Sequence, residues 1–204
     1  MNEHQLTVVE STWGGRPELV DTTGIIDYGS LMQLALERAK TAREAIKVMT
    51  GLVKKYGYYS SGESFTIADP NEAWILDLIG KGPGRRGAVW VAVRIPDDCI
   101  AGHANYPRIH KIPMDDKENC LYSPDVISFA REMGYFDGLN KDFSFARAYS
   151  PADFGALRAC DARVWSFFRK YDSTMDNYLP MSMENRLNRF RFMLNPRESY
   201  LYKI

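Results

Sequence analysis

The feature that most constrains the fold is a series of short β-favouring segments in the middle of the chain. Each is rich in β-branched and aromatic residues and too short for a helix that buries a core. Turn residues at Asp69–Glu72 and at Gly80–Gly87 separate them and predict antiparallel pairing, with a hairpin at the first turn. The predicted central strands are Ser64–Asp69, Ala73–Ile79, Ala88–Ile95 and Cys99–Ala104.

Helical patterns lie on both sides of these strands. A strand is expected at Gln5–Trp13, followed by a helix at Ser30–Lys40. Thr41 and Glu44 form a capping box that opens a second amphipathic helix. A further helix is expected from Asp153 to about Lys170. The order of strand, two helices, several strands and helices again predicts an α+β domain rather than alternating βαβ units.

Composition excludes several classes of partner. Lys and Arg together number 26, as do Asp and Glu, so charge gives no reason to expect nucleic acid or an anionic membrane. No apolar run is as long as a membrane span, and the first residues lack the pattern of a signal peptide, so a cytoplasmic location is expected. Three cysteines without a CxxC pair, and histidines without ligand spacing, predict no metal, no cofactor and no disulfide framework.

Two features could carry chemistry but have ordinary alternatives. Asn105 follows a predicted strand, where its amide could donate to a ligand oxygen or could simply form a turn. The glycine-rich stretch Gly80–Gly87 lacks the Walker spacing and precedes a strand, which favours a hairpin loop over a phosphate site.

The last predicted helix places a carboxylate on its apolar face. At 100° per residue, Asp161 lies among Val164, Trp165 and Phe168. Arg158, three residues earlier, can reach Asp161, which favours a structural ion pair over an acid or base in a cleft. Arg163 points away on the same wheel.

Several strings in consistent order resemble the cysteine dipeptidases of peptidase family C69, which belong to the N-terminal-nucleophile (Ntn) hydrolase superfamily and are related to penicillin acylases and bile-salt hydrolases. The resemblance covers residues 1–171 as one domain, and residues 172–204 remain an unplaced tail. The strings are Met1–Gln5, Glu10–Arg16, Glu63–Asp69, Glu72–Trp74 and Gly102–Asn105.

The resemblance implies an αββα sandwich and a hydrolase that cleaves dipeptides. It implies that Thr12 and Asn105 belong to the oxyanion site and that Arg163 lies near that site; Arg158 is a second candidate because of its place on the helical wheel. His103, Trp13 and Asn2 belong to the same strings and are expected to contact the substrate.

The nucleophile is the point at which the sequence departs from the family. Members use a cysteine that begins the mature chain, with its α-amine as base, whereas residues 1 and 2 here are Met and Asn. We therefore expect this chain alone to be inactive, as a fragment that lacks the strand bearing the nucleophile. Such a fragment is expected to expose an unpaired sheet edge and to self-associate. The alternatives are a non-catalytic peptide-binding or scaffold module and an enzyme that uses Cys99 or Cys120.

Overall fold

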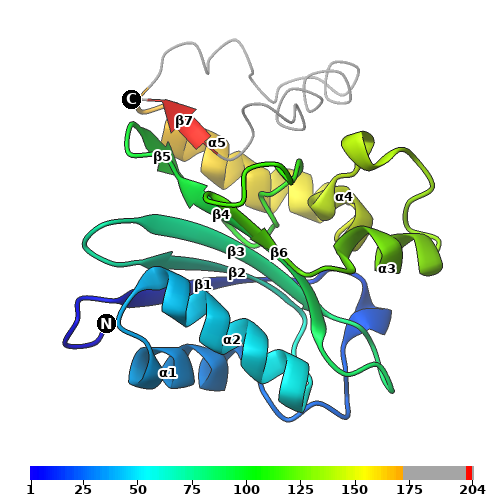
Figure 1. Cartoon of the computed structure of the whole chain (residues 1–204). Coiled ribbons are helices and arrows are strands. Elements are labelled where there is room, and N and C mark those ends of the chain that lie inside the picture. Colours follow the sequence, from blue (N-terminus) through cyan, green and yellow to red (C-terminus); the bar gives the residue numbers. More distant parts are fainter. Residues whose placement is uncertain (172–200, 204) are drawn as a thin grey trace.

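The structure is a computed structural model that describes residues 1–171 and 201–203. Its centre is a five-stranded antiparallel sheet in the order β1-β2-β3-β4-β6, in which β1 is one edge strand (Figure 1). The strands are β1 (Thr7–Trp13), β2 (Gly62–Ala68), β3 (Ala73–Gly80), β4 (Ala88–Ile95) and β6 (Cys120–Tyr122). A separate two-stranded sheet joins β5 (Cys99–Ala101) to β7 (Leu201–Lys203).

Strand alternation divides the core into two clusters, one on each face of the central sheet. Val8, Phe65 and Leu76 belong to the cluster beneath the two N-terminal helices. Trp13 and Ile75 belong to the other cluster, which packs against the C-terminal helical segments. Because side chains in a strand alternate between the faces, neighbouring residues contribute to different cores.

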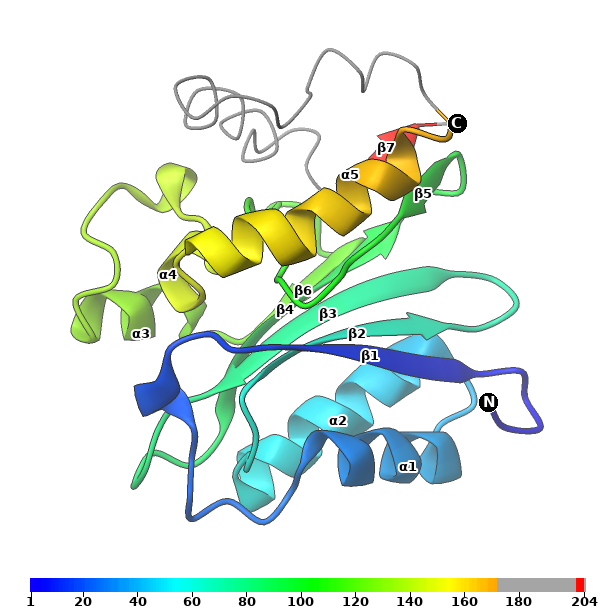
Figure 2. The same cartoon turned by 180° about the vertical axis from the view of Figure 1, so that it is seen from behind.

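The first face is covered by α1 (Tyr28–Arg38) and α2 (Ala42–Tyr56), which lie side by side in both views (Figures 1 and 2). Each begins at a side-chain cap, because Asp27 accepts a hydrogen bond from Ser30 N and Thr41 accepts one from Glu44 N. The Glu44 carboxylate accepts from Lys40 N rather than from the cap residue itself. Apolar side chains of both helices pack against the sheet.

The second face is covered by the loop after β5 and by the chain that runs from the end of β6 to residue 171. It includes α3 (Val126–Glu132), α4 (Phe145–Tyr149) and the short 3-10 turn η2 (Asn140–Asp142). A π-helical turn, η3 (Ala156–Asp161), leads directly into α5 (Ala162–Phe168), which runs across this face in Figure 2. A second 3-10 turn, η1 (Pro17–Leu19), follows β1.

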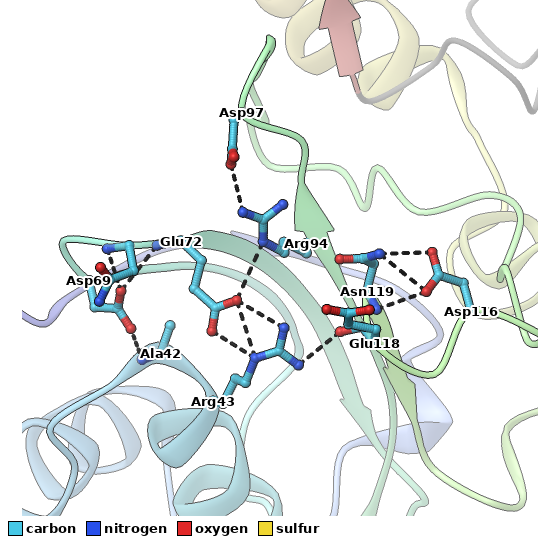
Figure 3. Close-up of polar contacts among 10 residues, drawn as sticks. Ala42, Arg43, Asp69, Glu72, Arg94, Asp97, Asp116, Glu118 and Asn119 are labelled. Carbon is cyan, nitrogen blue, oxygen red and sulfur yellow. Dashed lines mark hydrogen bonds and ion pairs between the residues drawn. The ribbon is translucent and has the colours of Figure 1, made fainter.

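A network of ion pairs joins four segments at one end of the sheet (Figure 3). The Glu72 carboxylate accepts from Arg43 Nε at 2.8 Å and lies 3.4 Å from Arg94 Nε, and Arg94 also pairs with Asp97. Arg43 donates a further hydrogen bond to the carbonyl oxygen of Glu118. These contacts connect four segments: the start of α2, the β2–β3 turn, β4 and the loop before β6.

The α+β class, the two N-terminal helices and the first hairpin are confirmed, with ends that differ by a few residues. Two predictions differ in form. The strand expected at Cys99–Ala104 ends at Ala101, and the helix expected from Asp153 to Lys170 is interrupted by the π-helical turn. Within the described residues, no helix is long and apolar enough to cross a membrane. The predicted tail, 172–204, lies outside the described residues apart from β7.

Candidate functional site

Asn105 lies on the loop after β5, and its backbone is tied to the edge strand β1. Its φ of 51° places it in the left-handed region, which asparagine tolerates better than most residues. Its backbone N–H donates to Ser11 Oγ at 2.6 Å, and its side-chain Nδ2 donates to the carbonyl oxygen of Thr12 at 2.5 Å. The amide side chain is therefore held against the end of β1.

Arg163 of α5 fixes the other end of the same amide. Its Nη2 donates to Asn105 Oδ1 at 2.8 Å and approaches the carbonyl oxygen of Ala104 at 3.4 Å. Its Nε donates to the carbonyl oxygen of Ala159 one turn earlier, which orients the guanidinium. The fold thus brings Asn105 into contact with a residue that lies 58 positions later in the chain.

In this arrangement the Asn105 amide can still donate one further hydrogen bond. Nδ2 carries two hydrogens, of which one is directed at the Thr12 carbonyl. Asn105 is exposed, so its second hydrogen can reach a ligand oxygen. An Arg163 guanidinium bound to Oδ1 polarises the amide and strengthens it as a donor. A fixed amide donor of this kind can stabilise a developing oxyanion.

The Thr12 side chain faces the opposite side of the sheet. It shares the face of Val8, and its hydroxyl donates to Glu63 Oε1 at 2.8 Å, with Glu10 Oε2 at 3.3 Å. Burial, together with the neighbouring Glu10 carboxylate, raises the pKa of Glu63 to about 8, although the hydrogen bond from Thr12 lowers it. Thr12 thus meets Asn105 through its backbone carbonyl only.

The three expected substrate-contacting residues lie in different places. His103 is half-buried beside the site, 2.7 Å from Thr66 Oγ1, and burial together with the Arg108 charge lowers its pKa. Trp13 is buried in the second core, where its indole N–H donates to Ser64 Oγ. Asn2 binds the carbonyl oxygens at the end of α1 through its amide, at the opposite end of β1 from Asn105.

A buried ion pair fixes the loop to the helical segment, but with a different arginine from the one predicted. Asp161 is buried and pairs with Arg108, whose side chain is also buried. Arg158 is exposed, and its guanidinium lies 5.8 Å from the ring centroid of Phe154. The prediction that Arg158 pairs with Asp161 is wrong, because the wheel considered only partners within one helix.

The cysteines and the metal-ligating residue types offer little further chemistry. Cys120 is buried, and burial raises the pKa of its thiol to about 12, which disfavours the nucleophilic thiolate. Cys99 is half-buried, and its thiol donates to Asp98 Oδ1 at 3.5 Å. Among residues 1–171 and 201–203, no group of three His, Cys, Asp or Glu side chains could hold a metal ion.

Comparison with known proteins gives the family. The model of peptidase family C69 matches residues 1–196. The chain belongs to peptidase family C69. A probable dipeptidase of Salmonella dublin is 29% identical over 178 residues, which is 84% of this chain and 39% of that protein.

Two further relatives are also much longer than the segment that matches this chain. A probable dipeptidase of Latilactobacillus sakei is 35% identical over 49% of the chain and 20% of its own length. A probable dipeptidase B of Streptococcus pyogenes serotype M1 is 28% identical over 60% of the chain and 23% of its own length. The chain therefore spans well under half the length of these curated relatives.

Two residues of the site were missed by sequence reasoning. Ser11 stands in the same string as Thr12 but was not singled out, although alternation along β1 places only one of the two on the Asn105 face. Arg108 follows Asn105 by three residues, and its burial depends on a helix more than fifty residues away. Strand alternation could have identified Ser11, whereas no local signal identifies Arg108.

Proposed function

We propose that this chain supplies the oxyanion-binding part of a dipeptidase of the cysteine type, with the Asn105 amide as the donor to the tetrahedral intermediate. The observation that carries the proposal is the three-point hold on Asn105, by Ser11, the Thr12 carbonyl and Arg163. Membership of family C69 and the dipeptidase names of the relatives support the same chemistry.

Each residue has a defined part in the proposed reaction. As a nucleophile attacks the peptide carbonyl, negative charge develops on its oxygen, and the free Nδ2 hydrogen of Asn105 binds that oxygen. Arg163 keeps the amide oriented through Oδ1. His103, which is half-buried beside Asn105, is proposed to contact the substrate. Trp13 and Asn2 are proposed to affect binding indirectly, because they hold β1 and the end of α1 in place.

The nucleophile is proposed to come from residues beyond these 204. Cys99, Cys120 and Cys160 are internal and have no α-amine to act as base. The curated relatives are more than twice the length of the matched segment, which leaves room for a cysteine-bearing strand. In the full protein that strand would complete the αββα sandwich; a chain without it would associate through the edge of β1.

A chimaera tests this proposal directly. This chain replaces the matching 178 residues of the Salmonella dublin relative, and dipeptide hydrolysis is measured by release of free amino acids. We expect hydrolysis, and we expect Asn105→Ala in the chimaera to lower kcat about 10²- to 10³-fold, as loss of an oxyanion donor does. Thr12→Val is the matched control, since it keeps the backbone carbonyl and should leave kcat within about threefold.

Two results would contradict the proposal in different ways. A folded chimaera without hydrolysis, together with dipeptide binding by calorimetry, would favour a peptide-binding module. An active chimaera in which Asn105→Ala changes nothing would remove Asn105 from the oxyanion site while leaving the dipeptidase activity in place.

A further inference from the structure

Residues 103–110 cross the face of the sheet opposite α1 and α2, above a row of polar side chains. The register pairs Ser11 with Ser64 and Ser64 with Asp77, so these residues lie side by side on β1, β2 and β3. Directly paired residues share a face of the sheet. One end of this row holds the loop, because Ser11 Oγ accepts from Asn105 N.

The other end of the row holds the loop through a buried carboxylate. Asp77 Oδ2 accepts from the backbone N–H groups of Arg108 and Ile109, at 3.0 and 2.9 Å. Asp77 Oδ1 accepts from Ser64 Oγ at 2.5 Å. Asp77 is fully buried, and these three donors satisfy a charge that would otherwise be costly to bury.

The chain between the two anchors has little slack. Ser11 and Asp77 are two strands apart, which is about 10 Å at roughly 4.8 Å per strand spacing. Three residues of chain, from Asn105 to Arg108, reach at most about 10–11 Å. Pro107 removes one further rotational freedom from this stretch. A displacement at Arg108 and Ile109 must therefore be transmitted to Asn105.

We infer that Asp77 is a positioning residue, which sets the place of the Asn105 amide through the backbone of Arg108 and Ile109. The inference rests on the proposed function of Asn105 and names a residue in β3 that acts on it without touching the substrate. The buried pair of Arg108 with Asp161 assists, because it holds the same residue from the α5 side. The Asn105 side-chain amide is thus held in place by the sheet on one side and by Arg163 on the other.

Nuclear magnetic resonance of the ¹⁵N-labelled chain tests the geometry without requiring catalysis. The Asn105 side-chain signals are identified by their loss in Asn105→Ala, and the backbone signal by sequential assignment. In Asp77→Ala we expect these signals to shift, and hydrogen exchange at Arg108 and Ile109 to accelerate at least about tenfold, because both amides lose their acceptor.

Two further variants separate positioning from stability. Asp77→Asn keeps an oxygen for both backbone amides and can donate to Ser64, so it should restore the wild-type signals and slow exchange. Leu76→Ala is the matched control: it removes a buried side chain from the neighbouring position, on the opposite face of the sheet. It should lower stability while leaving the Asn105 signals in place.

The same variants in the dipeptidase chimaera link position to function. Because a misplaced oxyanion donor slows the reaction without removing substrate contacts, we expect Asp77→Ala to lower kcat about tenfold with KM within about twofold, and Asp77→Asn to recover kcat to within about threefold. If Asp77→Ala does not fold, Asp77→Val fills more of the space, suits a strand and removes the same acceptors; the same shifts are expected.

The outcomes distinguish this inference from the function on which it rests. Unchanged Asn105 signals in Asp77→Ala or Asp77→Val, or equal shifts in Leu76→Ala, would overturn the positioning role. Asn105→Ala without effect on hydrolysis would overturn the proposed function, and the resonance measurement would still decide whether Asp77 places the loop.

Discussion

The two faces of the central sheet are stabilised in different ways. The face beneath α1 and α2 is mainly apolar, with Glu63 and Thr12 as a polar pair near its edge. The opposite face has an apolar cluster as well, but it also contains the row that ends at Asp77 and the buried pair of Arg108 and Asp161. Apolar burial is non-directional, whereas hydrogen bonds and ion pairs fix individual atoms. The residues of the proposed oxyanion site, Asn105 and Arg163, lie on the second face.

The largest effect is expected from breaking the ion pair of the second face. Asp161→Ala leaves the Arg108 charge buried without its carboxylate, and we expect a loss of about 3–5 kcal/mol in the free energy of unfolding. Urea denaturation followed by circular dichroism measures this loss. Asp115→Ala, at an exposed position, is the control and should change stability by less than about 0.5 kcal/mol.

A double replacement sharpens that result. Arg108→Met with Asp161→Leu removes both charges and fills the space with apolar atoms, so stability should return close to the wild-type value. The hydrogen bonds of Asn105 to Ser11, Thr12 and Arg163 should nevertheless weaken, since the loop loses the ion pair between Arg108 and Asp161. A double variant as unstable as Asp161→Ala would show that the ion pair itself, rather than an unpaired charge, stabilises this face.

A substitution on the apolar face should lower stability without moving Asn105. Met49 of α2 is fully buried in the core between that helix and the sheet, and Met49→Ala should cost about 2–5 kcal/mol through lost burial and the resulting cavity. The Asn105 signals should not move, because no directional contact to the loop is lost. Calorimetric unfolding together with the ¹⁵N spectrum checks both parts, and a shift of Asn105 would show that the two faces are coupled.

The effect that is smallest for each step of the experiment, a single pH unit, concerns the polar pair at the edge of the apolar face. The folded-state pKa of Glu63 is about 8, against 4.5 for an ordinary glutamate. The folded chain therefore binds this proton more tightly than the unfolded chain. Stability from this group is complete below about pH 4.5 and is lost as pH rises towards 8, by at most about 1.4 kcal/mol per pH unit.

Glu63→Gln tests the sign of that dependence. A glutamine mimics the protonated acid, so the variant should lose less stability than the wild-type chain between pH 5 and pH 8. Thermal unfolding across this range gives the measurement, and Glu3→Gln, at an exposed position, should follow the wild-type curve. A wild-type chain that becomes more stable with rising pH, relative to Glu63→Gln, would contradict the raised pKa.

The first face could be predicted from the sequence because its signals are local. The cap at Thr41, the apolar stripe of α2 and the turn at Asp69–Glu72 each depend on residues a few positions apart. The resulting helices and hairpin agree with the structure within a few residues. Asn105 and Arg163 were identified through family resemblance, and the structure brings them into contact.

The second face could not be predicted because its contacts join distant segments. Asp77 meets Arg108 and Ile109 across about thirty residues, and Arg108 meets Asp161 across about fifty. A helical wheel compares residues within one element only, so it assigned Asp161 to Arg158. It also assumed an uninterrupted α-helix, whereas the π-helical turn at Ala156–Asp161 changes the angular relation of residues on its two sides.

The left-handed backbone at Asn105 restricts which amino acids can be installed there by design. Glycine would accept a φ of 51° but would bring no side-chain donor. Glutamine would bring an amide on a longer arm and add about 1–2 kcal/mol of backbone strain. Aspartate tolerates the backbone yet would present an oxygen, instead of an N–H, to the Thr12 carbonyl. Backbone shape and donor chemistry select the same residue independently, so asparagine is the only one of these side chains that satisfies both.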